Sequence, residues 1–127
     1  MSDRERRTLL KALALAAAGA CRTPPPELPS VPLEELKNGA RVVVLVQGEP
    51  VEVLESAAGI EARSLLCTHM GCQVKWRPEE NEYRCPCHEG RYDARGNVVE
   101  GMPTGPLRRV PFIIEQDAVV FPDVGRG

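Results

Sequence analysis

The 127-residue chain has room for one domain with a modest core, and two separate domains are excluded. Its 16 basic and 18 acidic side chains leave a formal net charge of -2 without any basic block, so nucleic acid is not an expected partner. Twelve prolines and eleven glycines are spread along the chain, which favours short elements joined by many turns and argues against a helical bundle.

Residues 1–21 predict an export signal. The segment starts with charged residues, continues with a short run rich in alanine and leucine, and ends in small residues before Cys21. Arg6 and Arg7 resemble the pair of a twin-arginine signal, and the ending resembles a lipoprotein box in which Cys21 carries the lipid. Ordinary cleavage after the Ala-x-Ala pattern and an uncleaved anchor stay open, although the apolar run of residues 9–20 is shorter than the roughly 20 residues that span a bilayer.

From these features we expect an exported protein on the periplasmic, outer side of the cytoplasmic membrane. Lipid or the N-terminal segment would anchor it at the membrane surface. Residues 22–34 follow as a proline-rich tether, with prolines at 24, 25, 26, 29 and 32 that favour an extended chain. Residues 35–127 are then the folded domain, and residues 33–39 allow one helical turn that ends at Gly39.

The folded part has the pattern of an all-β domain. Short β-branched or alternating runs, separated by turn residues such as Gln47-Gly48 and Gln116-Asp117, predict strands. The expected strands are residues 40–46, 49–55, 60–66, 73–77, 82–85, 97–100, 107–115 and 118–122. Many short strands at close spacing favour an antiparallel sandwich or small barrel.

Two short segments hold four of the five cysteines and the only two histidines. Each segment directly follows a predicted strand, which would hold a tight loop in place. The first contains Cys67, His69 and Cys72, and the second contains Cys85, Cys87 and His88. Such a concentration of cysteine and histidine is typical of a metal site.

Three interpretations of these six residues stay open. A zinc site would use two sulfurs and two nitrogens, from Cys67, His69, Cys85 and His88. A disulfide framework would use the four cysteines alone. An iron-sulfur site would place Cys67 and Cys85 on one iron and His69 and His88 on the other, leaving Cys72 and Cys87 to form a disulfide. Only the last interpretation gives all six residues a role.

The two segments resemble the boxes of Rieske iron-sulfur proteins, Cys-x-His followed after 15 to 17 residues by Cys-x-x-His. Here 15 residues, 70 to 84, lie between His69 and Cys85. The resemblance is close from Cys67 to about Pro111. Because Cys72 and Cys87 are both present, the chain resembles the disulfide-containing branch of cytochrome bc-type complexes and arsenite oxidase small subunits. This resemblance implies an antiparallel β-sandwich or barrel with a small cluster-binding subdomain formed by two loops.

The resemblance also implies one [2Fe-2S] cluster per chain and a role in electron transfer. Histidine ligands raise the reduction potential, to about -150 to +300 mV across this class. We expect the iron-sulfur subunit of a quinol:cytochrome c oxidoreductase-like complex, with quinol or another donor, a cytochrome c-type acceptor and a cytochrome b subunit as partners. The alternative is a lipid-tethered or soluble periplasmic shuttle, or the small subunit of another oxidoreductase such as arsenite oxidase. No residue is expected to catalyse a reaction unaided.

Two positions after the second box concern the tuning of the cluster. High-potential relatives have Gly and then Ser after the last histidine, whereas this chain has Glu89 and then Gly90, which has no hydroxyl for a bridging sulfide. Tyr92 stands where the family's tyrosine bonds a cysteine ligand. The resemblance therefore predicts a potential below that of relatives that have both hydroxyl groups.

Overall fold

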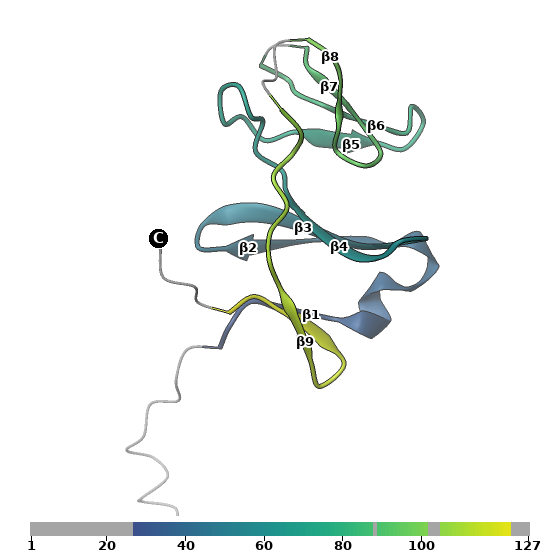
Figure 1. The fold of residues 1–127 in the computed structure, drawn as a ribbon, viewed down its shortest axis with the longest axis vertical. Coiled ribbons are helices and arrows are strands. Elements are labelled where there is room, and N and C mark those ends of the chain that lie inside the picture. Colours follow the sequence, from purple (N-terminus) through teal and green to yellow (C-terminus); the bar gives the residue numbers. More distant parts are fainter. Residues whose placement is uncertain (1–26, 88, 102–104, 123–127) are drawn as a thin grey trace, which may run out of the picture.

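The computed structural model describes residues 27–87, 89–101 and 105–122. In these ranges the chain forms ten short strands and one 3-10 helix, arranged in three antiparallel sheets that lie above one another as three layers (Figure 1). The prediction of an antiparallel all-β fold is confirmed.

The middle layer is a meander of β2 (Arg41–Val46), β3 (Glu49–Ser56) and β4 (Gly59–Ser64). The β2–β3 hairpin turns at Gln47 and Gly48, whose φ angles of 51° and 81° fit the tight two-residue turns that hairpins favour. Because side chains alternate along a strand, one face of this sheet contacts the lower layer and the other face contacts the upper layer.

The lower layer contains β1 (Ser30–Pro32), β10 (Ala118–Val120) and β9 (Ile113–Glu115), in that order. The 3-10 helix of Leu33–Gly39 follows β1 and carries the buried Leu36. The lower face of the middle sheet meets this layer in a core that includes Val31, Val51, Val53, Val119 and Phe121. Each such side chain contributes about 1.5 to 3 kcal/mol on burial, so this core anchors the rest of the domain.

The upper layer is a four-stranded meander of β5 (Lys75–Arg77), β6 (Glu82–Arg84), β7 (Arg91–Asp93) and β8 (Val98–Glu100). It has a core of its own, whose buried members are Leu65, Cys67, Val74, Tyr83, Cys85, Tyr92 and Leu107. This layer is the small subdomain that the two cysteine-containing loops were expected to form.

The structure differs from the sequence-based expectations in three places. Residues 30–32, inside the segment expected to be a tether, form β1, because Val31 is needed in the lower core. Residues 91–93 form β7, which was not anticipated. Residues 107–112 lie outside the strands except for an isolated bridge between Arg63 and Arg109, so only the end of the strand expected at 107–115 forms.

A polar cluster joins the middle and upper layers. Arg41 donates hydrogen bonds of 2.8 Å to the Glu52 carboxylate and to the Tyr83 hydroxyl, which itself bonds Glu52. The Arg41 guanidinium also lies 3.5 Å from the centre of the Trp76 ring. Glu52 is buried, and its charge is tolerated because a cation and a hydroxyl satisfy it. The cluster therefore fixes the upper subdomain on the sheet below.

Candidate metal centre

Both cysteine-containing loops are closed by backbone hydrogen bonds. In the first loop, the Cys67 N–H donates to the Cys72 carbonyl (2.7 Å), and the Gly71 N–H donates back to the Cys67 carbonyl (2.9 Å). Gly71 has a φ of 71°, a conformation that glycine adopts without steric cost. In the second loop, the Cys85 N–H donates to the Gly90 carbonyl (2.8 Å). Cys67 and Cys85 therefore occupy equivalent positions at the bases of two tight loops.

A disulfide between Cys72 and Cys87 links the two loops, with 6.4 Å between the Cα atoms. This is the pairing that the sequence resemblance implied, and the structure confirms it. The other two cysteines of the loops, Cys67 and Cys85, are buried and form no disulfide among the described residues. The interpretation in which all four cysteines form a disulfide framework is therefore wrong.

The surroundings of Cys67 favour its thiolate form. Burial disfavours the charge, but hydrogen bonds from Tyr92, from the His69 backbone, from Cys85 and from the Met70 backbone outweigh it and lower the pKa of the Cys67 thiol. The thiolate is the form that binds metals. Cys67 and Cys85 are buried in one core outside the disulfide, and they thus fit a centre that takes two sulfur ligands from this chain.

The structure describes one of the two histidines. His69 is half-buried in the first loop, two residues from Cys67. His88 lies outside the described residues, as do Arg6, Arg7 and Cys21. Within the described ranges, no three His, Cys, Asp or Glu side chains converge as ligands of one metal ion.

Tyr92 connects β7 to the first loop. Its side chain is fully buried, and its hydroxyl donates a hydrogen bond of 3.3 Å to Cys67 Sγ. Burial, followed by this bond to the sulfur, raises the pKa of Tyr92, so the hydroxyl keeps its proton and remains a donor. In register across the sheet lies Tyr83, whose hydroxyl instead faces Glu52 at the junction of the layers.

Thr68 is a functional candidate that the sequence analysis did not identify. Its backbone N–H donates to the Tyr92 hydroxyl (3.2 Å), and its own hydroxyl donates to the Gly105 carbonyl (2.9 Å). It thereby joins the first loop to β7 and to the segment that follows β8. The sequence feature that could have identified Thr68 is its position between Cys67 and His69, because a threonine hydroxyl in a loop readily bonds neighbouring backbone groups.

The second loop contains the two departures noted in the sequence. Gly90 is buried, and its carbonyl closes the loop by accepting the Cys85 N–H. Glu89 is exposed and has a φ of 52°, in the left-handed region that non-glycine residues rarely occupy. The loop geometry thus places glutamate where glycine would be unstrained.

Comparisons with known proteins agree with this geometry. The family model described as the Rieske [2Fe-2S] domain matches residues 27–111. The chain is 31% identical over 87 residues to the cytochrome b6-f complex iron-sulfur subunit of Chlorobaculum thiosulfatiphilum, covering 68% of this chain and 48% of that protein. It is 38% identical over 93 residues to the cytochrome b6-f complex iron-sulfur subunit 1 of Nostoc sp. strain PCC 7120, covering 70% of this chain and 52% of that protein.

A solved structure gives the same match. The cyanobacterial plasma membrane Rieske protein PetC3 from Synechocystis PCC 6803 superposes with a TM-score of 0.58 at 26% identity, covering 70% of this chain and 92% of that one. This chain spans about half the length of the curated relatives that it matches.

Proposed function

Since this chain belongs to the Rieske [2Fe-2S] family and binds one [2Fe-2S] cluster, we propose that it is the electron-transfer subunit of a quinol:cytochrome c oxidoreductase-like complex. The observation that supports it most is the combination of two buried cysteines outside any disulfide, Cys67 and Cys85, with the Cys72–Cys87 disulfide that links their two loops. The curated relatives, named as cytochrome b6-f complex subunits, point to the same kind of assembly and to a cytochrome b partner.

The ligand set is part of this proposal. Cys67 and Cys85 bind one iron through their sulfurs, and His69 and His88 bind the other through imidazole nitrogens. A cluster held in this way takes up and releases one electron at about -150 to +300 mV, which suits a quinol donor and a cytochrome c-type acceptor. Tyr92 supports the reduced state through its hydrogen bond to Cys67 Sγ.

The loops also suit docking to a partner. Met70 in the first loop is 62% exposed, although it is a large apolar side chain next to a proposed ligand. Exposed apolar side chains beside a functional site are common at protein–protein interfaces, and methionine adapts to varied surfaces. We propose that this loop faces the quinol-binding partner and that His69 and His88 approach the donor there.

The N-terminal region completes the proposal. Residues 1–21 direct twin-arginine export, the part of residues 22–34 that precedes β1 is the tether, and β1 together with residues 35–127 carries the electron-transfer domain. Anchoring on the periplasmic side uses lipid on Cys21 or the N-terminal segment itself. In the part of the chain that the structure describes, no helix is long and apolar enough to cross a membrane.

A second candidate is a membrane-tethered or soluble shuttle, or the small subunit of another oxidoreductase such as an arsenite oxidase. The exposed Glu89 favours this candidate, because it belongs to the second loop and an apolar quinol pocket would exclude its charge. A polar protein acceptor would tolerate that charge.

The test compares the reduction of the cluster by quinol in membranes and in the purified chain. We expect a cytochrome b to copurify with the chain, and we expect Met70→Glu to slow quinol-driven reduction while the visible spectrum stays unchanged. Leu45→Glu is the matched control, because Leu45 is 64% exposed on β2 in the middle layer, outside the cysteine loops. The shuttle would be favoured by equal rates of quinol-driven reduction in both variants. It would also be favoured if the chain purified without cytochrome b and accepted electrons only from a soluble protein.

A further inference from the structure

An open edge of the lower sheet carries two exposed apolar side chains. In the strand order β1-β10-β9, β9 pairs with β10 on one side, and no strand of the described residues pairs with its other side. Ile113 is 47% exposed and Ile114 is 55% exposed, although large apolar side chains gain free energy from burial. An unpaired edge with apolar side chains is a template for another extended chain.

The two isoleucines lie on opposite faces of the sheet. Ile114 is the cross-strand partner of the fully buried Val119, so it lies on the face that meets the lower core. Ile113 is the partner of Val120 on the other face. The lower core therefore ends at β9 in a half-covered side chain, and a strand added beside β9 would bury Ile114 and extend that core.

The lower layer next to this edge is acidic. Glu115 ends β9, and Asp117 lies in the turn before β10. The Asp117 carbonyl accepts the Leu33 N–H at 2.9 Å, which brings this turn to the 3-10 helix that contains Glu34 and Glu35. Residues 28–39 and 110–122, which form the lower layer, contain these four carboxylates and one lysine, so their formal net charge is -3.

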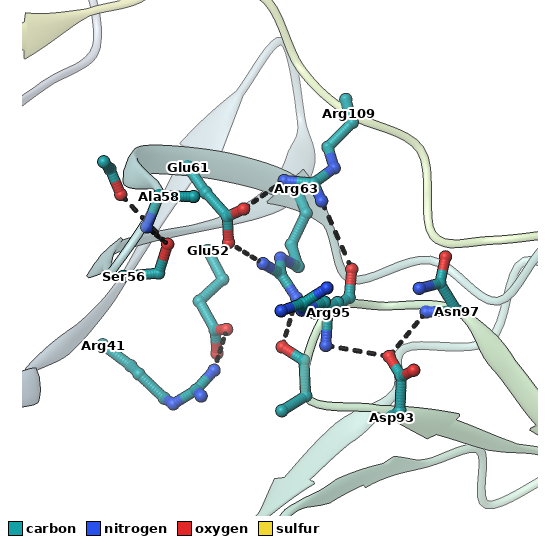
Figure 2. Close-up of polar contacts among 12 residues, drawn as sticks. Arg41, Glu52, Ser56, Ala58, Glu61, Arg63, Asp93, Arg95, Asn97 and Arg109 are labelled. Carbon is teal, nitrogen blue, oxygen red and sulfur yellow. Dashed lines mark hydrogen bonds and ion pairs between the residues drawn. The ribbon is translucent and has the colours of Figure 1, made fainter.

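These carboxylates differ from most of those in the two layers above. In the middle sheet, Glu52 pairs with Arg41, and Glu61 pairs with Arg63 and Arg109 (Figure 2). Arginines also pair with Glu49, Glu80, Glu82 and Glu100. The four carboxylates of the lower layer are exposed and make no ion pair with any described residue. Their negative charge is therefore available to a binding partner.

We propose that the open edge of β9 binds an extended, basic segment of a partner polypeptide. Such a segment would pair its backbone with β9, cover Ile113 and Ile114 with apolar side chains, and place lysine or arginine side chains beside the carboxylates of the lower layer. The charge of the layer selects this occupant. A second copy of this chain, or an anionic lipid surface, would bring like charges together at the same edge.

The position of the edge leaves the cysteine loops accessible. β9 belongs to the lower layer, and the middle sheet lies between it and the upper layer that carries the loops (Figure 1). A partner bound at β9 would leave the Met70 loop free to meet the electron donor. The inference therefore goes beyond the proposed function, because it concerns how another protein holds this chain and does not depend on the identity of the donor.

The test uses the full-length, cluster-containing protein and two synthetic peptides of equal length. One peptide alternates lysine with valine, and the other alternates glutamate with valine, so the two differ in the sign of their charge. We expect saturable binding of the lysine peptide alone in calorimetric titration, and weaker binding at higher ionic strength. Backbone amides of residues 113–115 should exchange hydrogen more slowly when the lysine peptide is bound.

Two variants at β9 have matched controls in the upper layer. Glu115→Lys should weaken binding of the lysine peptide about tenfold or more, whereas Glu79→Lys, the same charge change at an exposed residue between β5 and β6, should weaken it much less. Ile114→Ser should also weaken binding. Val99→Ser should not, because Val99 is 50% exposed on β8, which is the edge strand of another sheet. Glu115 and Ile114 are both exposed, so both variants at β9 should fold as the wild type does.

Other results would overturn the proposal. Equal weakening by Glu115→Lys and Glu79→Lys, or equal affinity for the two peptides, would show that the charge at β9 selects nothing. A wild-type dimer in analytical ultracentrifugation that Ile114→Ser abolishes would make a second copy the occupant. If the amides of residues 113–115 were already protected in the free protein and no peptide bound, another segment of the same chain would be the occupant.

Discussion

Replacement of Tyr92 by Phe removes one hydroxyl and should lower the reduction potential of the cluster. The hydroxyl donates to Cys67 Sγ at 3.3 Å from a fully buried position, so water cannot take its place. Reduction adds negative charge to the cluster, and a hydrogen bond to the sulfur of Cys67, a proposed ligand, is therefore stronger in the reduced state. Loss of the bond destabilises that state more than the oxidised one.

The size of the effect follows from the strength of a hydrogen bond to a charged group, roughly 1.5 to 3 kcal/mol. A one-electron couple shifts by about 59 mV for each 1.4 kcal/mol, so the whole bond would correspond to about 60 to 130 mV. Because the sulfur already accepts the bond in the oxidised state, we expect a decrease of tens of millivolts. Gly90→Ser, which introduces the missing hydroxyl in the second loop, should change the potential in the opposite direction.

Protein-film voltammetry at fixed pH measures this shift. Tyr83→Phe is a closely matched control, because Tyr83 pairs with Tyr92 across the sheet and its hydroxyl bonds Glu52 instead of sulfur. Its potential should stay near that of the wild type, while its stability should fall because buried Glu52 loses a donor. A Tyr92→Phe protein with an intact cluster and an unchanged potential would refute this explanation of the role of Tyr92.

Three further predictions concern stability. Replacing both Cys72 and Cys87 by serine should lower the free energy of unfolding by about 3 kcal/mol, as expected for a disulfide that closes a loop of 15 residues. The same variant should lose the colour of its cluster faster in the presence of a chelator, and an unchanged rate of colour loss would contradict this. Burial opposes the charge of Glu49, but hydrogen bonds from Ser64 and Arg108 hold the pKa of its carboxyl below the ordinary 4.5. The stability that the Glu49 carboxylate contributes is therefore lost as pH falls through that lowered pKa. Glu49→Gln should therefore show a flatter dependence of the unfolding midpoint on pH below 4.5 than the wild type, and parallel curves would exclude this contribution. Glu89→Gly should raise the unfolding free energy by up to about 1 kcal/mol in chemical denaturation, because it removes a strained left-handed glutamate, whereas Glu89→Ala should not.

The all-β fold and the cysteine pairing were predictable because their signals are local. Alternating apolar residues identified β2, β3 and β4, and the turn dipeptides at 47–48 and 116–117 adopt the positive φ angles that tight hairpins require. The Cys72–Cys87 bridge followed from a family pattern that covers a few residues.

The parts that were missed depend on contacts between distant segments. β7 was overlooked because Arg91–Asp93 has only three residues, two of them charged, and forms a strand through Tyr92 packing in the upper core. The role of β1 in the lower sheet was hidden by the prolines around it, although its pairing with β10 buries Val31. Neither pairing is visible in the local sequence.

The same reason hid the junction between the layers. Arg41, Glu52 and Tyr83 are separated along the chain by 11 and 31 residues, and each alone resembles an ordinary surface or strand residue. Only the fold shows that the buried carboxylate accepts hydrogen bonds from both partners.

The register of the upper sheet explains how one short meander contacts both the first cysteine loop and the sheet below it. Tyr83 on β6 and Tyr92 on β7 are direct cross-strand partners in one core, yet their hydroxyl groups bond different partners. Tyr92 reaches the sulfur of the first loop, and Tyr83 reaches the carboxylate of the sheet below. Because the two rings are packed in the same rigid core, a change in the base that displaces Tyr83 should be transmitted to Tyr92 through packing and not through charge. Removal of the Tyr83 hydroxyl alone, as in Tyr83→Phe, keeps both rings packed, so it weakens the junction around Glu52 without moving the donor of the Cys67 hydrogen bond.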